Sequence, residues 1–568
     1  LTGKFLHITD IHPDPHYVSG SRVDNSCHSG KGKKHDGTGK FGAPISPCDS
    51  PMTLADETFK WIKENLIGKI DFIIWTGDNV RHDNDNRHPR TELQIFELNE
   101  YIASKFIELL DADERSEHPE DEKDDDTTQN DHVFSVIPSL GNNDVFPHNL
   151  FAPGPTLQTR ELYRIWDNFV PQDQMHIFGR GAYYLQEVIP NKLAVISLNT
   201  LYWFVRNPLV DTCDKHTDPG FQQLEWLGIV LKELRSRGMK AWLSGHVPAI
   251  EKNYETSCYD KLALWKHEYR DVIIGSVYGH MNMDHFAVTD SQASWDRLHT
   301  KTISNSADSK DTIANIKGFK YESELEIASF DNFGLNKKFA SELDELEFNE
   351  IFEMSDPSNG KVAYLDTVRY VYSKVKNPRN WADIYGSRYS VENINPSVIP
   401  NYFPSLRVYE YNTTGLIEED NKDELNKPKT EETQTLNRTS HRSWEDIYQE
   451  LVDKSMPQSY PSEAEYGPAY LSQTFTPIRY VQYYANITAF NLGEREFSYE
   501  VEYISDEGDQ YNSQSGNGLT IKNYLMYARK LSFSTRAGKR KLQKKISESD
   551  AMWEAYLNKV FVSTGYED

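Results

Sequence analysis

Five short motifs rich in metal-ligand side chains constrain the fold of this chain more than any other feature. They occur in a fixed order, most of them directly after an apolar run: Asp10-Ile11-His12, Gly77-Asp78, Gly141-Asn142-Asn143-Asp144, Gly245-His246 and Gly279-His280. In a parallel α/β sheet, functional residues gather where the strands end. Asp, Asn and His side chains delivered there by separate strands can converge on a pair of metal ions, an arrangement suited to attack on phosphorus.

Apolar runs and helical periods alternate around these motifs. Residues 5–9 and 72–75 are predicted to be buried strands, and apolar residues at helical spacing predict a helix over 55–66 between them. Strand–helix–strand alternation is typical of a parallel sheet, so we expect an α/β fold. Residues 389–393 and 406–411 alternate in polarity like strands and are predicted to form a hairpin that returns to the sheet.

The chain has 568 residues, which exceeds one ordinary domain. Its polar residues concentrate in a few stretches, which favours insertions and a linker around a well-packed main domain. The expected segments are a main domain at 1–411 with an acidic insertion at 111–131 and a polar insertion at 286–360, a polar linker at 412–442, and a mostly helical C-terminal extension at 443–568.

The formal net charge of −26 argues against a binder of duplex nucleic acid, because such proteins usually carry a strongly basic domain. A local basic groove stays compatible with this charge, since exposed charges are screened beyond about 8 Å at physiological salt. No stretch approaches the ~20 apolar residues of a membrane span. Any membrane tether would therefore lie outside this chain, and the sequence leaves open whether the protein forms a homo-oligomer.

The cysteines and glycosylation sequons together favour a lumenal protein of the secretory pathway. Four cysteines fall in two sequence-local pairs, which is compatible with the disulfides Cys27–Cys48 and Cys213–Cys258. Asn-x-Ser/Thr sequons mark candidate glycosylation sites at Asn412, Asn437 and Asn486. Nothing resembling a signal peptide is present, so either the protein is cytosolic or its addressing segment is not part of this sequence.

The ordered motifs resemble those of the calcineurin-like metallophosphoesterase superfamily, whose pattern is Asp-x-His, Gly-Asp, Gly-Asn-His-Glu/Asp, Gly-His and Gly-His-x-His. The runs DIHPDPHY at 10–17, GDNVRHDND at 77–85 and PSLRVYEY at 404–411 look most like the fungal vacuolar endopolyphosphatases. The acid sphingomyelinase-like phosphodiesterases are the next most similar family. The superfamily resemblance covers about residues 4–285.

The resemblance implies a two-sheet sandwich flanked by helices and a hydrolase that cleaves internal phosphoanhydride bonds of inorganic polyphosphate, with a hydroxide between two metal ions as nucleophile. It also implies a vacuolar lumenal protein that is membrane-anchored before maturation. The cofactors would be two divalent ions drawn from Mg, Mn, Co, Zn and Fe. In the implied arrangement Asp10 and His12 hold the first ion, Asp78 bridges both, and Asn142, His246 and His280 hold the second.

The chain departs from the family pattern at two positions. Asn282 replaces the second histidine of the last motif: either its carbonyl oxygen ligates, which favours harder ions such as Mg²⁺ or Mn²⁺, or water fills that position. Asn143 replaces a histidine that donates a proton or stabilises charge. An amide delivers no proton, and an anhydride tolerates this better than an ester, because the anhydride expels a stable phosphate anion and the ester expels an alkoxide.

The remaining candidates for catalysis and substrate binding lie near the second motif and in the first loop. His82, four residues after Asp78, is the candidate proton donor, with a loop histidine packed beside the site as the alternative. The candidates for binding phosphate oxygens are the arginines that follow Asp78 in the sequence and the cationic side chains of the first loop. They are Arg81, Arg87, Lys33, Lys34 and His35.

Two other functions compete with polyphosphate hydrolysis. A phosphodiesterase acting on lipids or nucleotides predicts an apolar or base-stacking cleft and a proton donor at position 143, and the chain lacks that donor. A non-catalytic module that binds polyanions is suggested by the two asparagine replacements.

Overall fold

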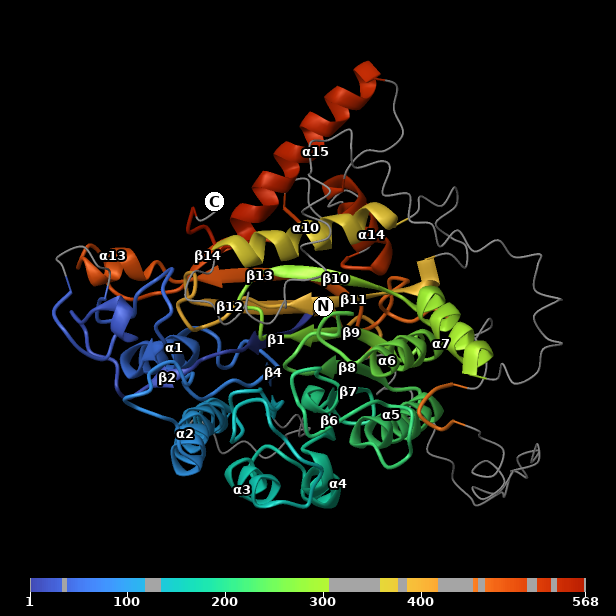
Figure 1. Ribbon diagram of the computed structural model, residues 1–568, viewed down its shortest axis with the longest axis horizontal. Helices are drawn as coiled ribbons and strands as arrows, with labels where there is room; N and C mark the ends of the chain where they lie inside the picture. The colour runs from blue at the N-terminus through green and yellow to red at the C-terminus, as the bar shows by residue number, and fades with distance from the viewer. Residues whose placement is uncertain are drawn as a thin grey trace, which may run out of the picture.

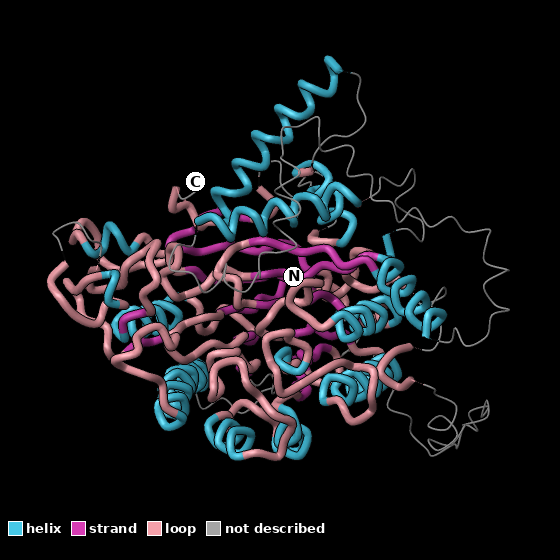
Figure 2. Tube along the Cα trace, in the orientation of Figure 1, coloured by secondary structure: helices cyan, strands magenta, loops and turns pink. Residues whose placement is uncertain are grey.

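Two six-stranded sheets form the centre of the molecule, and helices lie outside them (Figures 1 and 2). This is the helix-flanked two-sheet α/β sandwich that the motif order and the family resemblance predict. The computed structural model describes residues 2–32, 38–117, 134–305, 358–375, 386–416, 453–457, 465–507, 518–532 and 539–565.

The first sheet combines N-terminal and C-terminal strands in the order β14-β13-β12-β1-β4-β5. Its parallel half contains β1, β4 and β5, while β12, β13 and β14 pair antiparallel. The strand bounds are β1 Thr2–Ile8, β4 Phe72–Trp75, β5 Ser135–Pro138, β12 Ser405–Asn412, β13 Pro477–Tyr484 and β14 Glu500–Ile504.

The second sheet comes from the middle of the chain and has the order β10-β11-β9-β8-β7-β6. Four neighbouring strands, β11, β9, β8 and β7, run parallel, and β10 and β6 close the two edges antiparallel. The strand bounds are β6 Tyr184–Ile189, β7 Leu193–Ser197, β8 Lys240–Ser244, β9 Ile273–Tyr278, β10 His285–Asp290 and β11 Tyr389–Ile394. The short strands β2 Pro13–Asp14 and β3 Ser50–Pro51 pair separately.

The helices cover the outer faces of both sheets. In Figure 1, α1 and α2 lie beside the first sheet, α5, α6 and α7 lie beside the second, and α10, α14 and α15 gather above β13 and β10. The helix bounds are α1 Met52–Asn65, α2 Glu92–Glu117, α3 Leu157–Ile165, α4 Met175–Gly181, α5 Pro219–Ser236, α6 Thr256–Glu268, α7 Ser291–Asn305, α10 Ser358–Lys374, α13 Ile487–Asn491, α14 Ile521–Leu531 and α15 Lys539–Val560.

The two sheets face each other through aromatic and small polar side chains. The ring of Trp242 on β8 lies 5.2 Å from Phe5 of β1 and 5.6 Å from Tyr409 of β12. Nearer the site, the hydroxyl of Ser139 lies 2.9 Å from that of Ser197 and 2.8 Å from that of Ser244. Because helices and the opposite sheet cover both faces, the central strands are buried along their length and read as continuous apolar runs.

The structure corrects the expected hairpin at 389–411. β11 pairs with β9 and β10 in the second sheet, whereas β12 pairs with β1 and β13 in the first. The connection crosses between sheets, and on its way the amides of Val398 and Ile399 donate to the carbonyls of Thr9 and Asp10. Alternating polarity shows that a strand has two faces, but it does not identify the neighbouring strand.

The C-terminal region contains the expected helices α13, α14 and α15, but it also supplies β13 and β14 to the first sheet. It is therefore partly a continuation of the main domain. The acidic insertion begins inside α2, which ends at Glu117. The polar insertion begins inside the strand β10 and contains α7 and the start of α10. The rest of both insertions and most of the linker at 412–442 lie outside the described residues.

Both disulfides compatible with the cysteine spacing are present. Cys27 is bonded to Cys48, and Cys213 is bonded to Cys258. Within the described part of the chain, we find no helix that is both long and apolar enough to span a membrane.

Candidate metal centre

Each of the five motifs follows the carboxyl end of a strand. The first three follow β1, β4 and β5, and the last two follow β8 and β9. The two sheets therefore contribute to one site at their common edge, as parallel strand ends predict. Hydrogen bonds join the halves: the Nδ1 atom of His246 lies 2.7 Å from the carbonyl oxygen of Thr76.

Two groups of metal-ligand atoms share one carboxylate. In the first group, the Nε2 atom of His12 lies 3.6 Å from an oxygen of Asp10 and 3.3 Å from an oxygen of Asp78. In the second, the Nε2 atom of His246 lies 3.2 Å from the same oxygen of Asp78, and His280 is close by. Asp78 thus stands between the groups, which is the position of a bridging ligand.

Asn142 joins the second group through its side-chain oxygen. That oxygen lies 2.9 Å from the Nε2 atom of His246 and 2.8 Å from the Nδ1 atom of His280. All the ligand residues expected from the sequence are thereby brought into one cluster, with Asn282 beside His280 on the pocket wall.

The backbone around the site is strained. Five of the seven expected ligands have a positive φ, although none is glycine: Asp10 at 51°, His12 at 44°, Asp78 at 58°, His280 at 71° and Asn282 at 57°. A non-glycine residue in this region costs about 1–3 kcal/mol and persists where the surroundings impose it, most often at functional sites. The turns after the strands therefore aim these side chains at the cost of local stability.

Close packing requires the glycine with which two of these motifs begin. A Cβ atom at Gly279 would lie 1.9 Å from the hydroxyl of Thr9 and 2.4 Å from a carboxylate oxygen of Asp10. At Gly141 it would lie 2.2 Å from a carboxylate oxygen of Asp78. Glycine is therefore needed at these two positions because the backbone passes so close to the ligand carboxylates that no side chain fits.

Carboxylates and imidazoles alternate in a buried cluster. Burial opposes ionisation of Asp78, but His246 and His12 hold the pKa of its carboxyl well below the usual range. Burial also lowers the pKa of His246, yet the carboxylates of Asp78 and Asp10 raise that pKa to about 9. A cation bound between these groups would replace the imidazole protons, because metal ligands must be deprotonated.

Two buried side-chain atoms without a hydrogen-bond partner among the described residues show that the site fits metal ions. They are the Nε2 atom of His12 and the side-chain oxygen of Asn282. The other ring nitrogen of His12 is held by the carbonyl of Val80 at 2.7 Å, which turns Nε2 towards the carboxylates. Such a second contact orients the histidines of metal sites.

Asn143 contacts the shared carboxylate. Its backbone amide donates to Asp78 at 2.8 Å and its side-chain amide donates to the other oxygen of Asp78 at 2.9 Å. Arg90 donates to the backbone carbonyl of Asn143 at 2.9 Å. The residue predicted at a proton-donor position is therefore placed to orient Asp78. Asp144 fixes the same turn, since it accepts from the amides of Asp78, Asn79 and Gly141.

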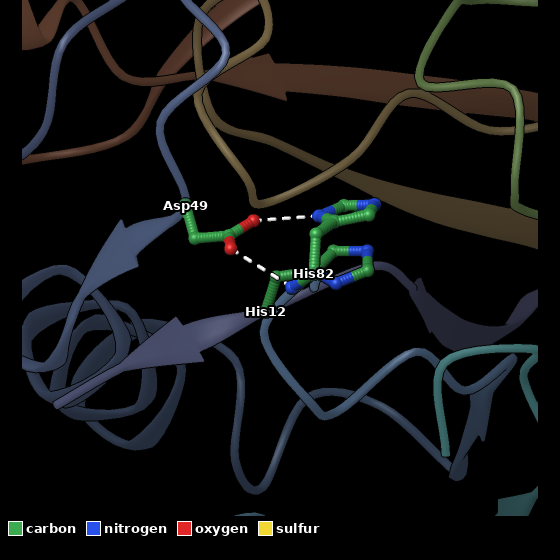
Figure 3. A group of neighbouring side chains, drawn as sticks. All are labelled: His12, Asp49 and His82. Atoms are coloured by element: carbon green, nitrogen blue, oxygen red, sulfur yellow. Dashed lines mark hydrogen bonds and ion pairs between the residues drawn. The ribbon is translucent and has the colours of Figure 1, made fainter. Parts of the chain in front are cut away.

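His82 forms a pair with Asp49 at the edge of the site (Figure 3). Its Nδ1 atom lies 2.6 Å from one carboxylate oxygen of Asp49, and its backbone amide donates to the other at 2.8 Å. The ring stacks on that of His12 with centroids 4.2 Å apart. His82 lines the pocket and remains partly exposed, so its second nitrogen can reach substrate.

A cavity of about 140 Å³ opens over the two groups. Its lining contains two groups of residues: the metal-ligand residues, which we call the metal-ligand wall, and three cationic residues, which we call the cationic wall. The cations come from the loop after β7, the loop before α6 and the helix α10: they are Arg206, Lys252 and Lys361. Drug-sized ligands usually occupy pockets of about 300–1,000 Å³, so this cavity suits a slim anion better than a nucleotide or lipid.

The structure corrects the cationic residues chosen from the sequence. Arg81 is fully buried, and its guanidinium donates to Gln94 at 3.0 Å and to the carbonyls of His82 and His88, so it cannot hold substrate. Arg87 is exposed and paired with Asp85 outside the cavity. Closeness to Asp78 in sequence did not put either side chain in the pocket, although His82, between them in the sequence, lines it. Lys33, Lys34 and His35 lie outside the described residues.

Several residues in the pocket or bonded to its lining have weak sequence signals. Asp49 and Lys252 stand in polar loops with no motif around them, and Arg206 follows an aromatic run. Lys361 gives a stronger signal, since a lysine stands at the first position of the helical period that Tyr364, Leu365 and Val368 continue.

The glycosylation sequons lie far from these motifs in the sequence. The side-chain amide of Asn412 donates to the carbonyl of Gln473 at 3.1 Å, and Asn486 begins α13 by accepting from the amide of Ala489 at 3.2 Å. Both side chains are half-buried, and Asn437 lies outside the described residues. Glycosylation at these positions stays a prediction.

The chain is similar in sequence to known proteins over most of its length. The family model described as calcineurin-like phosphoesterase matches residues 3–284. The endopolyphosphatase of Saccharomyces cerevisiae is 43% identical over all of this chain and 86% of its own length. The endopolyphosphatases of Debaryomyces hansenii and Yarrowia lipolytica are 44% and 38% identical, and the matches cover 94% and 100% of this chain and 76% and 93% of theirs. The chain belongs to the endopolyphosphatase family of calcineurin-like phosphoesterases.

Proposed function

We propose that this protein hydrolyses internal phosphoanhydride bonds of inorganic polyphosphate with the help of two divalent cations. The observation that carries the proposal is the pair of ligand groups that share Asp78 in a cavity also lined by cationic side chains. The relatives named endopolyphosphatase, which match almost the whole chain, support the same substrate.

In this proposal the protein supplies two adjoining ligand sets. Asp10, His12 and Asn282 hold one cation, and Asn142, His246 and His280 hold the other, with Asp78 between them. When bound, the two cations supply activation of a water nucleophile and neutralisation of charge on the attacked phosphoryl group. The mixed oxygen and nitrogen donors leave the metal identity open among Mg, Mn, Co, Zn and Fe, and the oxygen of Asn282 favours the harder ions.

The residues available to protonate the leaving group favour an anhydride substrate. Asn143 is engaged with Asp78 and has no proton to give, so His82 is the group that can protonate a departing oxygen. Asp49 holds one ring nitrogen of His82 and so directs the other towards the cavity. A phosphate leaving group needs little protonation, whereas an alkoxide needs it strongly.

The competing phosphodiesterase function is less well supported. Phe204, Val205 and Met281 add some apolar surface to the cavity, but its small volume and its cations suit a bare anion. A purely electrostatic polyanion binder would not explain why five ligand residues are held with strained backbone around one carboxylate.

The test is a metal-replete assay that compares two substrates. Long-chain polyphosphate should be shortened, with products of intermediate length resolved by gel electrophoresis. A phosphodiester with an alkoxide leaving group, such as glycerophosphocholine, should be hydrolysed at least about 100-fold less efficiently, because the alkoxide must be protonated and Asn143 cannot supply the proton. Efficient diester cleavage with no shortening of polyphosphate would overturn the proposal.

The expected location is the lumen of the vacuole. Two intact disulfides and the sequons at Asn412, Asn437 and Asn486 support an oxidising lumenal environment. Digestion with an endoglycosidase, followed by mass measurement of the natural protein, would test whether the sequons are used.

A further inference from the structure

Lys361 is a buried ammonium group on the wall of the catalytic cavity. Its side chain is 6% exposed, and its Nζ atom has no hydrogen-bond or ion-pair partner among the described residues. The cavity that it lines also contains Asp10, His280 and Asn282. A charged group in this position is costly unless an anion accompanies it.

The helix α10 fixes the position of Lys361. Tyr364, Leu365 and Tyr372 continue the buried stripe that Lys361 begins. The hydroxyl of Tyr372 donates to the carbonyl of Phe286 on β10 at 2.6 Å, and the hydroxyl of Tyr364 lies 2.8 Å from a ring nitrogen of His285. The helix is thus held against the second sheet along its length, so the ammonium stays at the cavity wall.

The protein offers Lys361 only weak compensation. Its nitrogen lies 4.7 Å above the ring of Tyr402, a contact whose strength is modest compared with that of a buried ion pair. Burial lowers the pKa of Lys361 to about 8, and the nearby carboxylate of Asp10 opposes this shift. Asp10 belongs to the candidate metal centre, where a bound cation would neutralise it. An anion from outside the protein is therefore the missing partner.

We propose that Lys361 forms a second phosphate subsite beside the metal centre and binds the phosphoryl group next to the one under attack. This inference rests on the proposed function and specifies its substrate contact. The oxygen of water bonds to the attacked phosphorus and loses a proton to the solvent, the bond from that phosphorus to the bridging oxygen breaks, and the neighbouring phosphate leaves with the electron pair. Lys361 neutralises the charge that develops on this leaving phosphate.

The subsite predicts a preference for substrates with at least two linked phosphates. A monophosphate ester fills the metal centre alone, whereas an anhydride reaches Lys361 as well. Arg206 and Lys252 line the same cavity and are less buried than Lys361, so further phosphates of a chain could contact them. Their loops are joined by the amide of Val205, which donates to the carbonyl of Asn253 at 2.9 Å.

Inhibition by two simple anions tests the subsite without depending on polyphosphate turnover. Hydrolysis of p-nitrophenyl phosphate by the metal-loaded enzyme serves as the readout, with methylenediphosphonate and orthophosphate as inhibitors. In K361M the inhibition constant of methylenediphosphonate should rise about 10- to 100-fold, the loss expected for one charge-assisted contact. That of orthophosphate should change less than about threefold, because orthophosphate needs the metal centre alone.

Two further variants complete the test. K361R should keep part of the diphosphonate affinity, and K374M, which removes an exposed lysine of the same helix, should behave like the native enzyme. Equal weakening of both inhibitors in K361M would assign Lys361 to the integrity of the metal centre and overturn the inference, as would an unchanged constant for methylenediphosphonate. If the native enzyme fails to shorten polyphosphate, the proposed function falls, while the comparison of the two inhibitors still decides the subsite.

Discussion

The two walls of the catalytic cavity differ in how they are built. The metal-ligand wall comes from five turns that follow parallel strands of both sheets, and its backbone is strained at Asp10, His12 and Asp78. The cationic wall comes from two loops and one helix, with Lys361 as its buried member. The side chains of the metal-ligand wall are placed by the local turns after the strands and by the order of those strands in the sheets. The side chains of the cationic wall are placed by the packing of segments that are far apart in the sequence.

This difference separates chemistry from substrate recognition. Side chains at strand ends are held by the sheets and can keep two cations at a fixed separation. Cations on loops and on a peripheral helix can vary without disturbing that geometry. We therefore expect changes on the metal-ligand wall to abolish catalysis and changes on the cationic wall to alter which anions bind.

The largest effect is expected for Asp78→Asn, which removes the carboxylate shared by both ligand groups. Activity should fall by at least about 10³-fold, equal to about 4 kcal/mol of the reaction barrier, with reduced metal content. Elemental analysis of the purified variant beside a polyphosphate assay measures both. Asp173→Asn, at an exposed position far from the site in sequence, is the matched control. Retained turnover in Asp78→Asn would contradict the two-metal site.

A smaller, substrate-dependent effect is expected for His82→Gln. Because a phosphate leaves without much protonation, polyphosphate cleavage should fall less than about tenfold, whereas diester cleavage should fall about 100-fold. Asp49→Asn should show the same pattern in weaker form, since it only orients His82. Rates on both substrates across pH measure it. Equal losses on both would show that His82 does not act as the proton donor.

A change of metal preference is expected for Asn282→His, which restores the imidazole of the family motif. Nitrogen ligation favours zinc over harder ions, so the ratio of zinc-supported to magnesium-supported activity should rise about tenfold, the lower end for changes around a metal site. Asn282→Ala separates this from simple loss of the oxygen ligand. An unchanged ratio in Asn282→His would place Asn282 outside the ligand set.

The smallest effect is expected for Arg87→Ala. The guanidinium is exposed, pairs with Asp85 and stays outside the cavity, so kcat/KM for polyphosphate should remain within about twofold of native. Steady-state kinetics at physiological salt measures it. A tenfold rise in KM would show that Arg87 binds substrate, which would contradict its placement outside the cationic wall.

Much of the fold and of the metal-ligand wall could be predicted from sequence because the signals are local. An apolar run, a glycine and then Asp, Asn or His describe a strand and the turn after it, and Gly279 and Gly141 show why glycine is needed there. The substrate contacts could not be predicted this way. Arg81 follows Asp78 by three residues but is buried away from the cavity, whereas Lys361 lies far along the chain and faces it.

The order of the motifs by itself determined the α/β fold and the shared edge, because parallel strands bring their carboxyl ends together however long the connections are. Only the tertiary structure decided which strands pair, that β11 and β12 belong to different sheets, and which cations reach the cavity. Those outcomes depend on packing between segments hundreds of residues apart, and no local pattern records such contacts.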